Sequence, residues 1–508
     1  MAAVQRCGAK GNAHIRRLGA LALFALVLGM GGCADQEVTE PDLSGTPESW
    51  VLHWNQIAVD ASGLDHTPPD GGDRVWGEQL GPGRASRAMA IVHVAIFEAL
   101  NAIVGGYESY LGLEPAAPAK APGGPAPAVG SDDIALKAAV AQAAHDALVA
   151  VFPAQAEHFD EYLATDLAAM SAGSERDRGM DAGRRAAAAI LARRNGDGSE
   201  HPEPRLGIEY IPGDDPGEWR QDPIGQHAIA LGARWGEVQP FALESAPAYR
   251  VPPPPPLGSG AYAAAFDEAK SIGGDGKTTI TVRSEEATTT GIYWAYDGTP
   301  SLCAPPRLYN QIAVLVAEQQ GSGVVELARL LALVNVAMAD AGIAIWESKY
   351  HYKFWRPVTG IREADAGMGP TGLGDGNPAT VADPTFTPLG APASNLSGPN
   401  FTPPFPAYPS GHAGFGGALF ETLRRFYGTD AVSFTFVSDE FNGTTRDWEG
   451  IVRPLIPRMF ASFSEAEEEN GQSRIYLGIH WSFDKTEGIA QGRRVAERVF
   501  GALFRPRS

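Results

Sequence analysis

Residues 84–104, with the sequence RASRAMAIVHVAIFEALNAIV, decide the class of the fold. This stretch is apolar at helical spacing and has no internal Gly or Pro, so it predicts one long helix. The same patterning predicts further helices at 131–152, 154–194 with one break, 307–319, 323–355, 412–427, 457–476 and from about 480 onward. Alternating strand patterns are scarce, and residues 278–282 are the best short candidate. The sequence therefore predicts a mostly α-helical protein.

Length and charge narrow the class of protein. The chain has 508 residues, and at ~150 residues per domain this leaves room for about three domains. Its 60 acidic and 40 basic residues give a net charge of −20. This charge argues against non-specific nucleic-acid binding, which needs cations to displace phosphate counterions. With only three cysteines, the chain cannot contain a disulfide framework or a zinc site built from cysteines.

The first 33 residues resemble a bacterial lipoprotein signal. Basic residues precede an apolar run over 18–30, which is too short to cross a bilayer as a helix but suits a signal-peptide core. Two glycines and Cys33 follow. We therefore expect residues 1–32 to be a signal peptide, the protein to be exported, and Cys33 to carry a lipid anchor at the bacterial cell envelope. Alternatively, the segment is a plain secretory signal with an incidental cysteine. With Cys33 acylated, Cys303 is unpaired, so the core and not disulfides must stabilise the protein.

Composition suggests how the remainder is divided. Residues 33–48 are polar and predict a tether, and residues 49–250 predict an N-terminal helical bundle. A linker is expected over 251–290, because it opens with a run of five prolines typical of polyproline II spacers. Residues 291–508 then predict a C-terminal helical bundle.

Three segments of the C-terminal half carry candidate chemistry, and the first is KYHYKFWRP at 349–357. Lys349 and Arg356 are seven residues apart, which is two helical turns, so both are expected on nearly one face. Pro357 disfavours helical geometry at Arg356 and should end the helix there. Two cations on an apolar helix need an anion between them, because burying them unpaired is costly. Alternatively, they mark a solvent-facing helix end.

The second segment is YPSGH at 408–412, directly before a predicted helix. Ser410 can cap that helix, and Gly411 allows a backbone N–H to approach an oxyanion closely. The positive end of the helix dipole adds to this attraction. The alternative is an ordinary turn and cap.

The third segment is SRIYLGIHWSFD at 473–484. Six positions separate Arg474 from His480, and one unbroken helix would point them in different directions. Gly478 can end the first helix and redirect the chain, so that both face one pocket. Asp484, four residues after His480, can hold its ring tautomer. Alternatively, His480 and Asp484 are a surface pair on a helix.

Together the motifs Lys-x6-Arg-Pro, Pro-Ser-Gly-His and Ser-Arg-x5-His-x3-Asp resemble a known signature. It is shared by the vanadium-dependent haloperoxidases and the acid-phosphatase/phosphatidate-phosphatase superfamily. The resemblance implies an all-α fold of two four-helix bundles, with the active site in the C-terminal bundle. It also implies a vanadate or phosphate site formed by Lys349, Arg356, Ser410, Gly411, Arg474 and His480.

The two branches of the superfamily imply different roles for the two histidines. In the haloperoxidases, the residue at the His480 position bonds vanadium and the one at the His412 position acts as acid/base, while Lys349 would polarise peroxide. In the phosphatases, the residue at the His480 position attacks phosphorus and the one at the His412 position protonates the leaving group.

Residues around these motifs resemble the fungal vanadium chloroperoxidases most. Phe405 and Trp346 match the aromatic residues of their halide pocket, whereas the algal bromoperoxidases place a histidine where Phe405 stands. By the same resemblance, Asp297 would pair with Arg474. Each has a plainer alternative: Trp346 and Phe405 as core aromatics, and Asp297 as a turn residue.

The sequence thus predicts an exported vanadium-dependent haloperoxidase. With vanadate as cofactor, it would oxidise bromide, and chloride as well, with hydrogen peroxide to hypohalous acid, which then reacts with an unknown small organic acceptor. His351 and Lys353 stand where the fungal segment carries acids, which could shift the histidine pKa values. Two alternatives stay open: an exported acid phosphatase with His480 as nucleophile, and a non-catalytic oxyanion-binding lipoprotein. His412 and Asp484 argue against the second, because binding alone needs no acid/base group.

Overall fold

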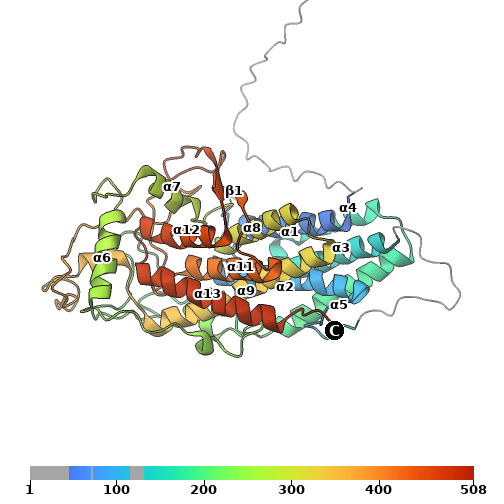
Figure 1. The fold of residues 1–508 in the computed structure, drawn as a ribbon, viewed down its shortest axis with the longest axis horizontal. Coiled ribbons are helices and arrows are strands. Elements are labelled where there is room, and N and C mark those ends of the chain that lie inside the picture. The colour runs from blue at the N-terminus through green and yellow to red at the C-terminus, as the bar shows by residue number, and fades with distance from the viewer. Residues whose placement is uncertain (1–44, 70–72, 115–130, 508) are drawn as a thin grey trace, which may run out of the picture. The chain divides into compact units, whose positions relative to one another are not determined.

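The computed structural model describes residues 45–69, 73–114 and 131–507, and helices predominate in this part of the chain (Figure 1). Its α-helices are α1 (Pro47–Asp65), α2 (Gly81–Val104), α3 (Ser131–Val151), α4 (Ala156–Ala169), α5 (Ser174–Arg194), α6 (Gly260–Ile272), α7 (Glu285–Tyr293), α8 (Pro305–Gln320), α9 (Val324–Tyr352), α10 (Pro357–Arg362), α11 (Gly411–Tyr427), α12 (Phe463–Tyr476) and α13 (Ser482–Ala502). Short 3-10 helices lie at Pro153–Gln155, Trp235–Glu237 and Ala246–Tyr249. An antiparallel pair of strands, β1 (Phe434–Asn442) and β2 (Leu455–Phe460), packs beside the helices.

Helix α9 lies at the centre of the core. By length and composition α2, α3 and α9 could each cross a membrane, but 83%, 67% and 100% of their most apolar windows are buried inside the protein. Helix α9 packs against α2 on one side and against α11 and α13 on another, and these helices run side by side in Figure 1. A helix that is apolar all round is explained here by burial in the protein core.

Glycines bring α11 and α13 into backbone contact. A Cβ atom on Gly492 would lie 2.0 Å from the carbonyl oxygen of Gly414, and one on Gly488 would lie 2.7 Å from that of Ser410. The backbone N–H of Ser410 also donates to the carbonyl of Asp484 at 3.0 Å. The starts of the two helices, which carry the second and third motifs, are therefore held next to each other.

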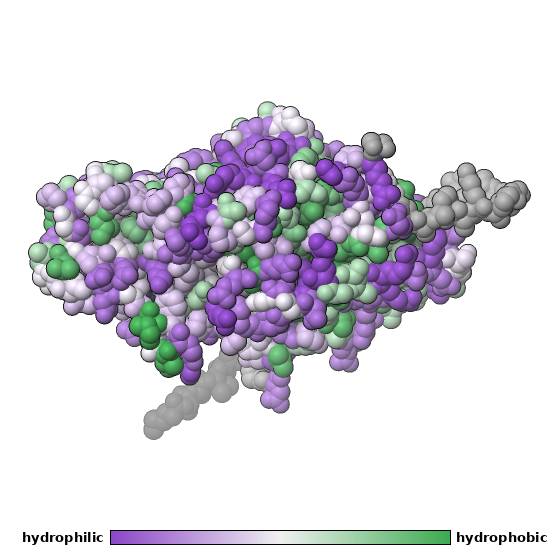
Figure 2. Space-filling model, turned by 90° about the horizontal axis from the view of Figure 1, so that it is seen from below, coloured by the Kyte–Doolittle hydropathy of each residue, from purple (hydrophilic) through white to green (hydrophobic). Residues whose placement is uncertain are grey.

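The surface agrees with the acidic, polar composition. On the face shown in Figure 2, hydrophilic residues cover most of the described chain, and hydrophobic ones form small scattered groups. The large apolar side chains are mostly in the core clusters, so the helical periodicity reports packing within the protein.

Most of the predicted long helices are confirmed, including 84–104 within α2. The break expected within 154–194 falls between α4 and α5. The strand expected at 278–282 is absent, and the helix expected over 457–476 begins only at Phe463, because residues 455–460 pair as β2 with β1. Helices α1, α6, α7 and α10 were not predicted.

The expected division into an N-terminal and a C-terminal bundle stays a prediction. The described residues form one compact unit, and α2 of the N-terminal half packs directly on α9 of the C-terminal half. The mostly helical class is confirmed, whereas two separate four-helix bundles and the boundaries at 250 and 290 stay predictions. The expected signal peptide and Cys33 lie outside the described residues.

Candidate active site

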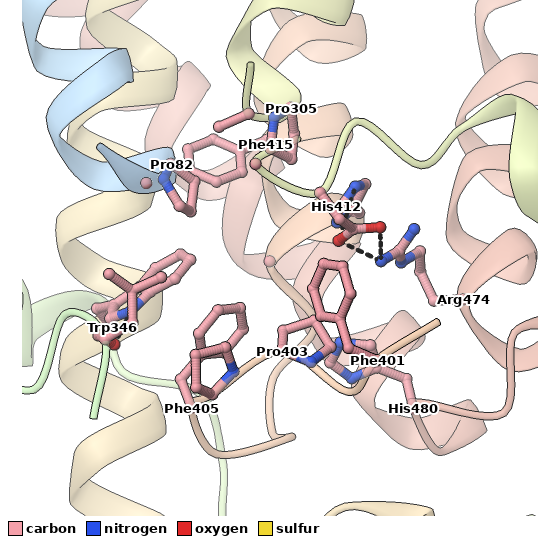
Figure 3. A pocket seen from close by; sticks show the side chains of 17 residues that line it. Pro82, Pro305, Trp346, Phe401, Pro403, Phe405, His412, Phe415, Arg474 and His480 are labelled. Carbon is pink, nitrogen blue, oxygen red and sulfur yellow. Dashed lines mark hydrogen bonds and ion pairs between the residues drawn. The ribbon is translucent and has the colours of Figure 1, made fainter. Parts of the chain in front are cut away.

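A small pocket lies where the end of α9 and the starts of α11 and α13 meet. Its free volume is about 60 Å³, enough for several water-sized groups. Most of its wall is apolar. Figure 3 shows Trp346 and Phe405 together on one side, and His412, Arg474 and His480 gathered on the other. The pocket thus brings residues of the second and third motifs together with Trp346, which lies on α9 three positions before Lys349.

The first motif lies beside the pocket, and its local structure differs from the prediction. Helix α9 ends at Tyr352, four residues before Arg356, because Lys353 adopts a left-handed conformation with φ +51°. Pro357 does not end α9; it begins α10, with Arg356 in extended geometry as its N-cap. The expectation that Lys349 and Arg356 share one helix face is therefore wrong.

Lys349 and Arg356 nevertheless converge on the same ring. The Lys349 Nζ lies 5.0 Å from the centre of the Phe405 ring, and the Arg356 Cζ lies 4.9 Å from it. Nζ of Lys349 donates to the carbonyls of Pro406 and Ala407 at 2.8 and 2.9 Å. An ammonium has three N–H bonds, so one remains for another acceptor.

The second motif places His412 in the first turn of α11. Ser410 caps this helix, its Oγ accepting from the N–H of Ala413 at 3.4 Å. Gly411 lies against the pocket, where a Cβ would come 3.4 Å from the Trp346 ring. The Nε2 of His412 donates to the carbonyl of Ala295 in a short hydrogen bond. Because a carbonyl only accepts, the proton is on Nε2, and Nδ1 of the neutral ring carries the lone pair.

Two residues that the sequence analysis did not assign hold the backbone at His412. The Tyr309 hydroxyl and the Asn470 side-chain amide donate to the carbonyl of His412 at 2.9 and 3.0 Å. They are 161 positions apart in the chain, so no local pattern could have indicated this clamp.

The third motif turns at Gly478, as expected. Gly478 has φ +70°, and a Cβ there would lie 2.3 Å from the carbonyl oxygen of Gly273. Helix α12 therefore stops at Tyr476 and α13 starts at Ser482, so Arg474 and His480 both line the pocket.

The imidazole of His480 is fixed from both ends. Its Nδ1 donates to Oδ2 of Asp484 at 2.7 Å, which makes Nε2 the acceptor nitrogen. Nη1 of Arg356 donates to that Nε2 at 2.9 Å. Asp484 also accepts from the N–H of Trp481 at 3.0 Å, so a helix cap positions the carboxylate.

Arg474 is oriented by Asp297, and the expected ion pair is present. Its Nη2 donates to both carboxylate oxygens of Asp297 at 2.7 and 2.9 Å (dashed in Figure 3). Its Nε and Nη1 are buried and have no hydrogen-bond partner among the described residues. Leaving two such donors unpaired is costly, and it indicates that they are meant for a ligand.

Cations outnumber carboxylates among the charged side chains in and directly around the pocket wall. Burial, and then the charge of Arg356, lowers the pKa of Lys349 well below its usual value, and burial lowers that of Arg356 to about 9. Burial and the neighbouring cations also lower the pKa of both His412 and His480. Burial raises the pKa of Asp484 to about 7. An anion in the pocket would relieve this imbalance by stabilising the protonated cations.

The polar pocket residues are surrounded by aromatic ones. Trp346 and Phe405 have ring centres 5.0 Å apart, and the Trp346 Nε1 donates to the Leu231 carbonyl at 3.1 Å. Phe401 and Phe415 add two further rings that the sequence analysis did not single out. His351 and Lys353 are solvent-exposed and do not line the pocket.

The fold and the site define a helical protein with a buried, cationic oxyanion pocket and two oriented histidines. The family model described as the second helical-bundle domain of VCPO matches residues 329–507. The chain is 32% identical to vanadium chloroperoxidase of Curvularia inaequalis, over 88% of this chain and 80% of that protein. The chain therefore belongs to the vanadium haloperoxidase family, as the three motifs predicted.

Solved structures show the same fold. A bacterial vanadium-dependent iodoperoxidase matches 90% of this chain and 97% of its own, with a TM-score of 0.66 and 23% identity. An apo-type bacterial vanadium-dependent chloroperoxidase matches 83% of this chain and 94% of its own, with a TM-score of 0.60 and 16% identity.

Proposed function

We propose that this protein uses vanadate to oxidise bromide and chloride with hydrogen peroxide. The observation that carries the proposal is a pair of buried donors, Arg474 Nε and Nη1, that have no partner among the described residues. They lie beside a histidine, His480, whose Nε2 lone pair accepts from Arg356. Together they fit an oxyanion whose central atom accepts a nitrogen ligand, which is the chemistry that the family names describe.

The residues of the pocket fit vanadate. His480 would supply the nitrogen ligand, since Asp484 holds the proton on the opposite ring nitrogen. The remaining N–H of Lys349 and the free N–H groups of Arg474 would neutralise its oxygens. Arg356 adds a third cation next to the same nitrogen.

Vanadate, when bound, supplies a pentavalent Lewis acid that makes peroxide open to attack by halide without a change of vanadium oxidation state. His412 would accept a proton from hydrogen peroxide at Nδ1, the nitrogen that its hydrogen bond to Ala295 leaves free. Asp297 keeps the guanidinium of Arg474 in one orientation. Lys349 would donate its third N–H toward a peroxide oxygen and polarise it.

The halide preference rests on two aromatic residues. Trp346 and Phe405 stand where the resemblance to the fungal chloroperoxidases places the halide pocket, and the structure puts their rings in contact. An apolar binding site with little water suits a large, weakly hydrated anion. Bromide is also oxidised more easily than chloride. We further propose export with a lipid anchor at Cys33, supported by residues 1–33 alone.

The test uses mature protein stripped of phosphate. Bromination and chlorination of monochlorodimedone are measured with peroxide, before and after addition of orthovanadate. Halogenation that requires vanadate and is suppressed by excess phosphate is the expected result. Hydrolysis of p-nitrophenyl phosphate without halogenation would instead make the protein a phosphatase with His480 as nucleophile. Oxyanion binding without turnover of either substrate would make it a binding protein.

A further inference from the structure

A second and much larger cavity adjoins the pocket. Its volume is about 600 Å³, against about 60 Å³ for the oxyanion pocket. We call it the Phe401 groove and define it by Lys277, Ile292, Leu389, Phe401, Thr402 and Trp448. Phe401 lines both cavities, and in Figure 3 its side chain lies at the pocket close to Pro403 and His480.

The two volumes suit two kinds of reactant. The smaller pocket has room for only a few water-sized groups, the size of inorganic reactants. Cavities that bind organic molecules are typically ~300–1,000 Å³, a range that includes the groove. An organic molecule in the groove would be separated from the oxyanion pocket by the side chain of Phe401.

The walls of the groove favour an uncharged aromatic ligand. Ile292, Leu389, Phe401 and Trp448 contribute apolar surface, and Trp448 is 41% exposed. Lys277 lies over the Trp448 ring at 5.1 Å and is paired with a neighbouring glutamate.

The other charged side chains on the groove are also engaged within the described chain. Arg453 forms an ion pair with Glu440. Asp222, Asp275 and Asp447 accept hydrogen bonds from backbone N–H groups. These backbone hydrogen bonds orient the three carboxylates without neutralising them, so the groove disfavours an anionic ligand.

One polar atom on the groove lacks a partner. Thr402 is 2% exposed, and its Oγ1 is buried with no hydrogen-bond partner in the described chain. A hydroxyl can donate one hydrogen bond and accept two, so it matches a ligand with a single hydroxyl group. An unmet buried hydroxyl costs stability, which a bound ligand would restore.

We propose that the Phe401 groove binds the organic acceptor, and that this acceptor is a neutral, electron-rich aromatic molecule of the phenol class. The proposal rests on the proposed function for its oxidant. Hypohalous acid formed in the pocket transfers halogen to a ring carbon: the C–X bond forms and the O–X bond breaks. The halogen is reduced and the ring carbon oxidised, and the ring proton leaves with the hydroxide as water.

The experiment uses 2-naphthol as the probe and has two independent readouts. Equilibrium binding is measured by titration calorimetry with protein free of vanadate. The KM for bromination of 2-naphthol is measured with vanadate, and the oxidation of bromide to tribromide is followed without organic acceptor. Wild-type protein is expected to bind 2-naphthol saturably.

Two variants and two matched controls decide the outcome. Trp448→Ala is expected to weaken binding and raise the KM about fivefold to tenfold by loss of ring stacking. Thr402→Val is expected to do so about fivefold by loss of the hydrogen bond. Bromide oxidation should be unchanged in both. Trp76→Ala removes a tryptophan that is also 41% exposed, and Thr299→Val removes another buried hydroxyl without a partner; neither lines the groove, and neither should change binding.

Each result is decisive for one of the two proposals. Equal 2-naphthol binding and KM in wild type and both groove variants would overturn the groove as acceptor site, as would no binding at all. Absence of bromide oxidation in the wild type would overturn the proposed function, while the calorimetry would still decide whether the groove binds a phenol.

Discussion

Two clusters of buried charges in this protein differ in charge balance and in their surroundings. The first lies between α2, α5 and α9 and contains Arg87, Arg194, Asp197 and Asp340, two cations and two carboxylates. Arg87 donates to Asp197 at 2.7 Å, Arg194 pairs with the same carboxylate, and Asp340 accepts three backbone N–H groups. The Nε of Arg194 is buried without a partner among the described residues, and the cluster lines neither of the two cavities.

The oxyanion pocket has three cations in or beside its wall, Lys349, Arg356 and Arg474, against Asp297 and Asp484. Its unpaired N–H groups belong to a residue that lines a cavity. Burial of charge alone therefore does not indicate function here. An excess of positive charge beside a cavity does indicate a functional site, because only an anionic ligand can neutralise that excess.

The first cluster, with two cations and two carboxylates, is called the balanced cluster. The largest expected effect is the loss of one ion-pair partner in this cluster. Asp197→Ala would leave the buried Arg194 and the partly buried Arg87 without their carboxylate, and should lower the free energy of unfolding by about 3–5 kcal/mol. Urea denaturation followed by circular dichroism measures it. Asp181→Ala breaks an exposed pair with Arg185 and should cost less than about 0.5 kcal/mol. Equal effects of the two substitutions would show that the cluster is not a structural unit.

Removing a cation beside the pocket should lower activity without lowering stability, the reverse of the effect expected in the balanced cluster. Lys349→Met is expected to lower vanadate-dependent halogenation about 10²–10³-fold, the usual loss for one donor at a developing oxyanion. Without oxyanion, its free energy of unfolding should be unchanged or higher, because a buried charge with like-charged neighbours is removed. Lys353→Met, an exposed change next to the same helix end, is the control and should alter neither. Full activity in Lys349→Met would contradict the assignment.

An anion that binds in the oxyanion pocket should stabilise the folded protein, and this effect should not depend on the balanced cluster. Orthovanadate at 100 times its Kd would raise the free energy of unfolding by about 2.7 kcal/mol through mass action. Thermal unfolding with and without orthovanadate, or phosphate, measures the shift. The shift should persist in Asp197→Ala and vanish in Lys349→Met. A shift that survives Lys349→Met would place the anion elsewhere.

A smaller effect is expected from the residue that orients the histidine. Asp484→Asn removes the carboxylate that fixes the proton on Nδ1 of His480, and should weaken vanadate affinity about 10–100-fold, as is typical for such partners of metal-bound histidines. Titration of activity with orthovanadate measures the affinity. Glu487→Gln, one turn further along α13, is the control. Affinities within twofold of each other in the two variants would argue against this role of Asp484.

Much of the helical framework was predictable because apolar residues recur at helical spacing along each long helix, however the helices pack together. Helix α1 was missed, since several of its polar residues, among them Asn55, Ser62 and Asp65, are buried and blur the pattern. The strand β2 was read as part of a helix because its pairing partner lies about 20 residues upstream and gave no signal of its own. Strand pairing between two separate segments cannot be predicted from the residues of either segment alone.

In the pocket, too, features set by neighbouring residues were predictable, and features set by residues distant in the chain were not. The turn at Gly478 and the cap at Ser410 follow from residue type and were predicted. The end of α9 was not, since it depends on a left-handed lysine, a conformation that favours glycine. The carbonyls that hold Lys349 come from residues 57 and 58 positions away and could only be found in the folded chain.

The balanced cluster can also be tested by pH, because its two carboxylates respond in opposite directions. Burial raises the pKa of Asp340 to about 6 from the usual 3.8, even though three backbone N–H groups and Arg194 oppose the shift. The native state therefore keeps a proton that the unfolded chain has released, and the stability this gives is present below pH ~4 and lost as the pH rises through about 6. For Asp197 burial also acts upward, but the hydrogen bond and charge of Arg87 and the charge of Arg194 hold its pKa below the usual value, so its contribution is lost on acidification.

Asp340→Asn separates the two contributions. Between pH 4 and 6, the free energy of unfolding of the wild type relative to this variant should fall by about 1 kcal/mol per pH unit, somewhat below the limit for one proton. Asp197→Ala should leave that slope in place while removing the acid-side loss. Parallel curves for wild type and Asp340→Asn would mean that Asp340 stays ionised in the fold. The cluster would then carry two full negative charges against two arginines, and its balance would come from ion pairing alone.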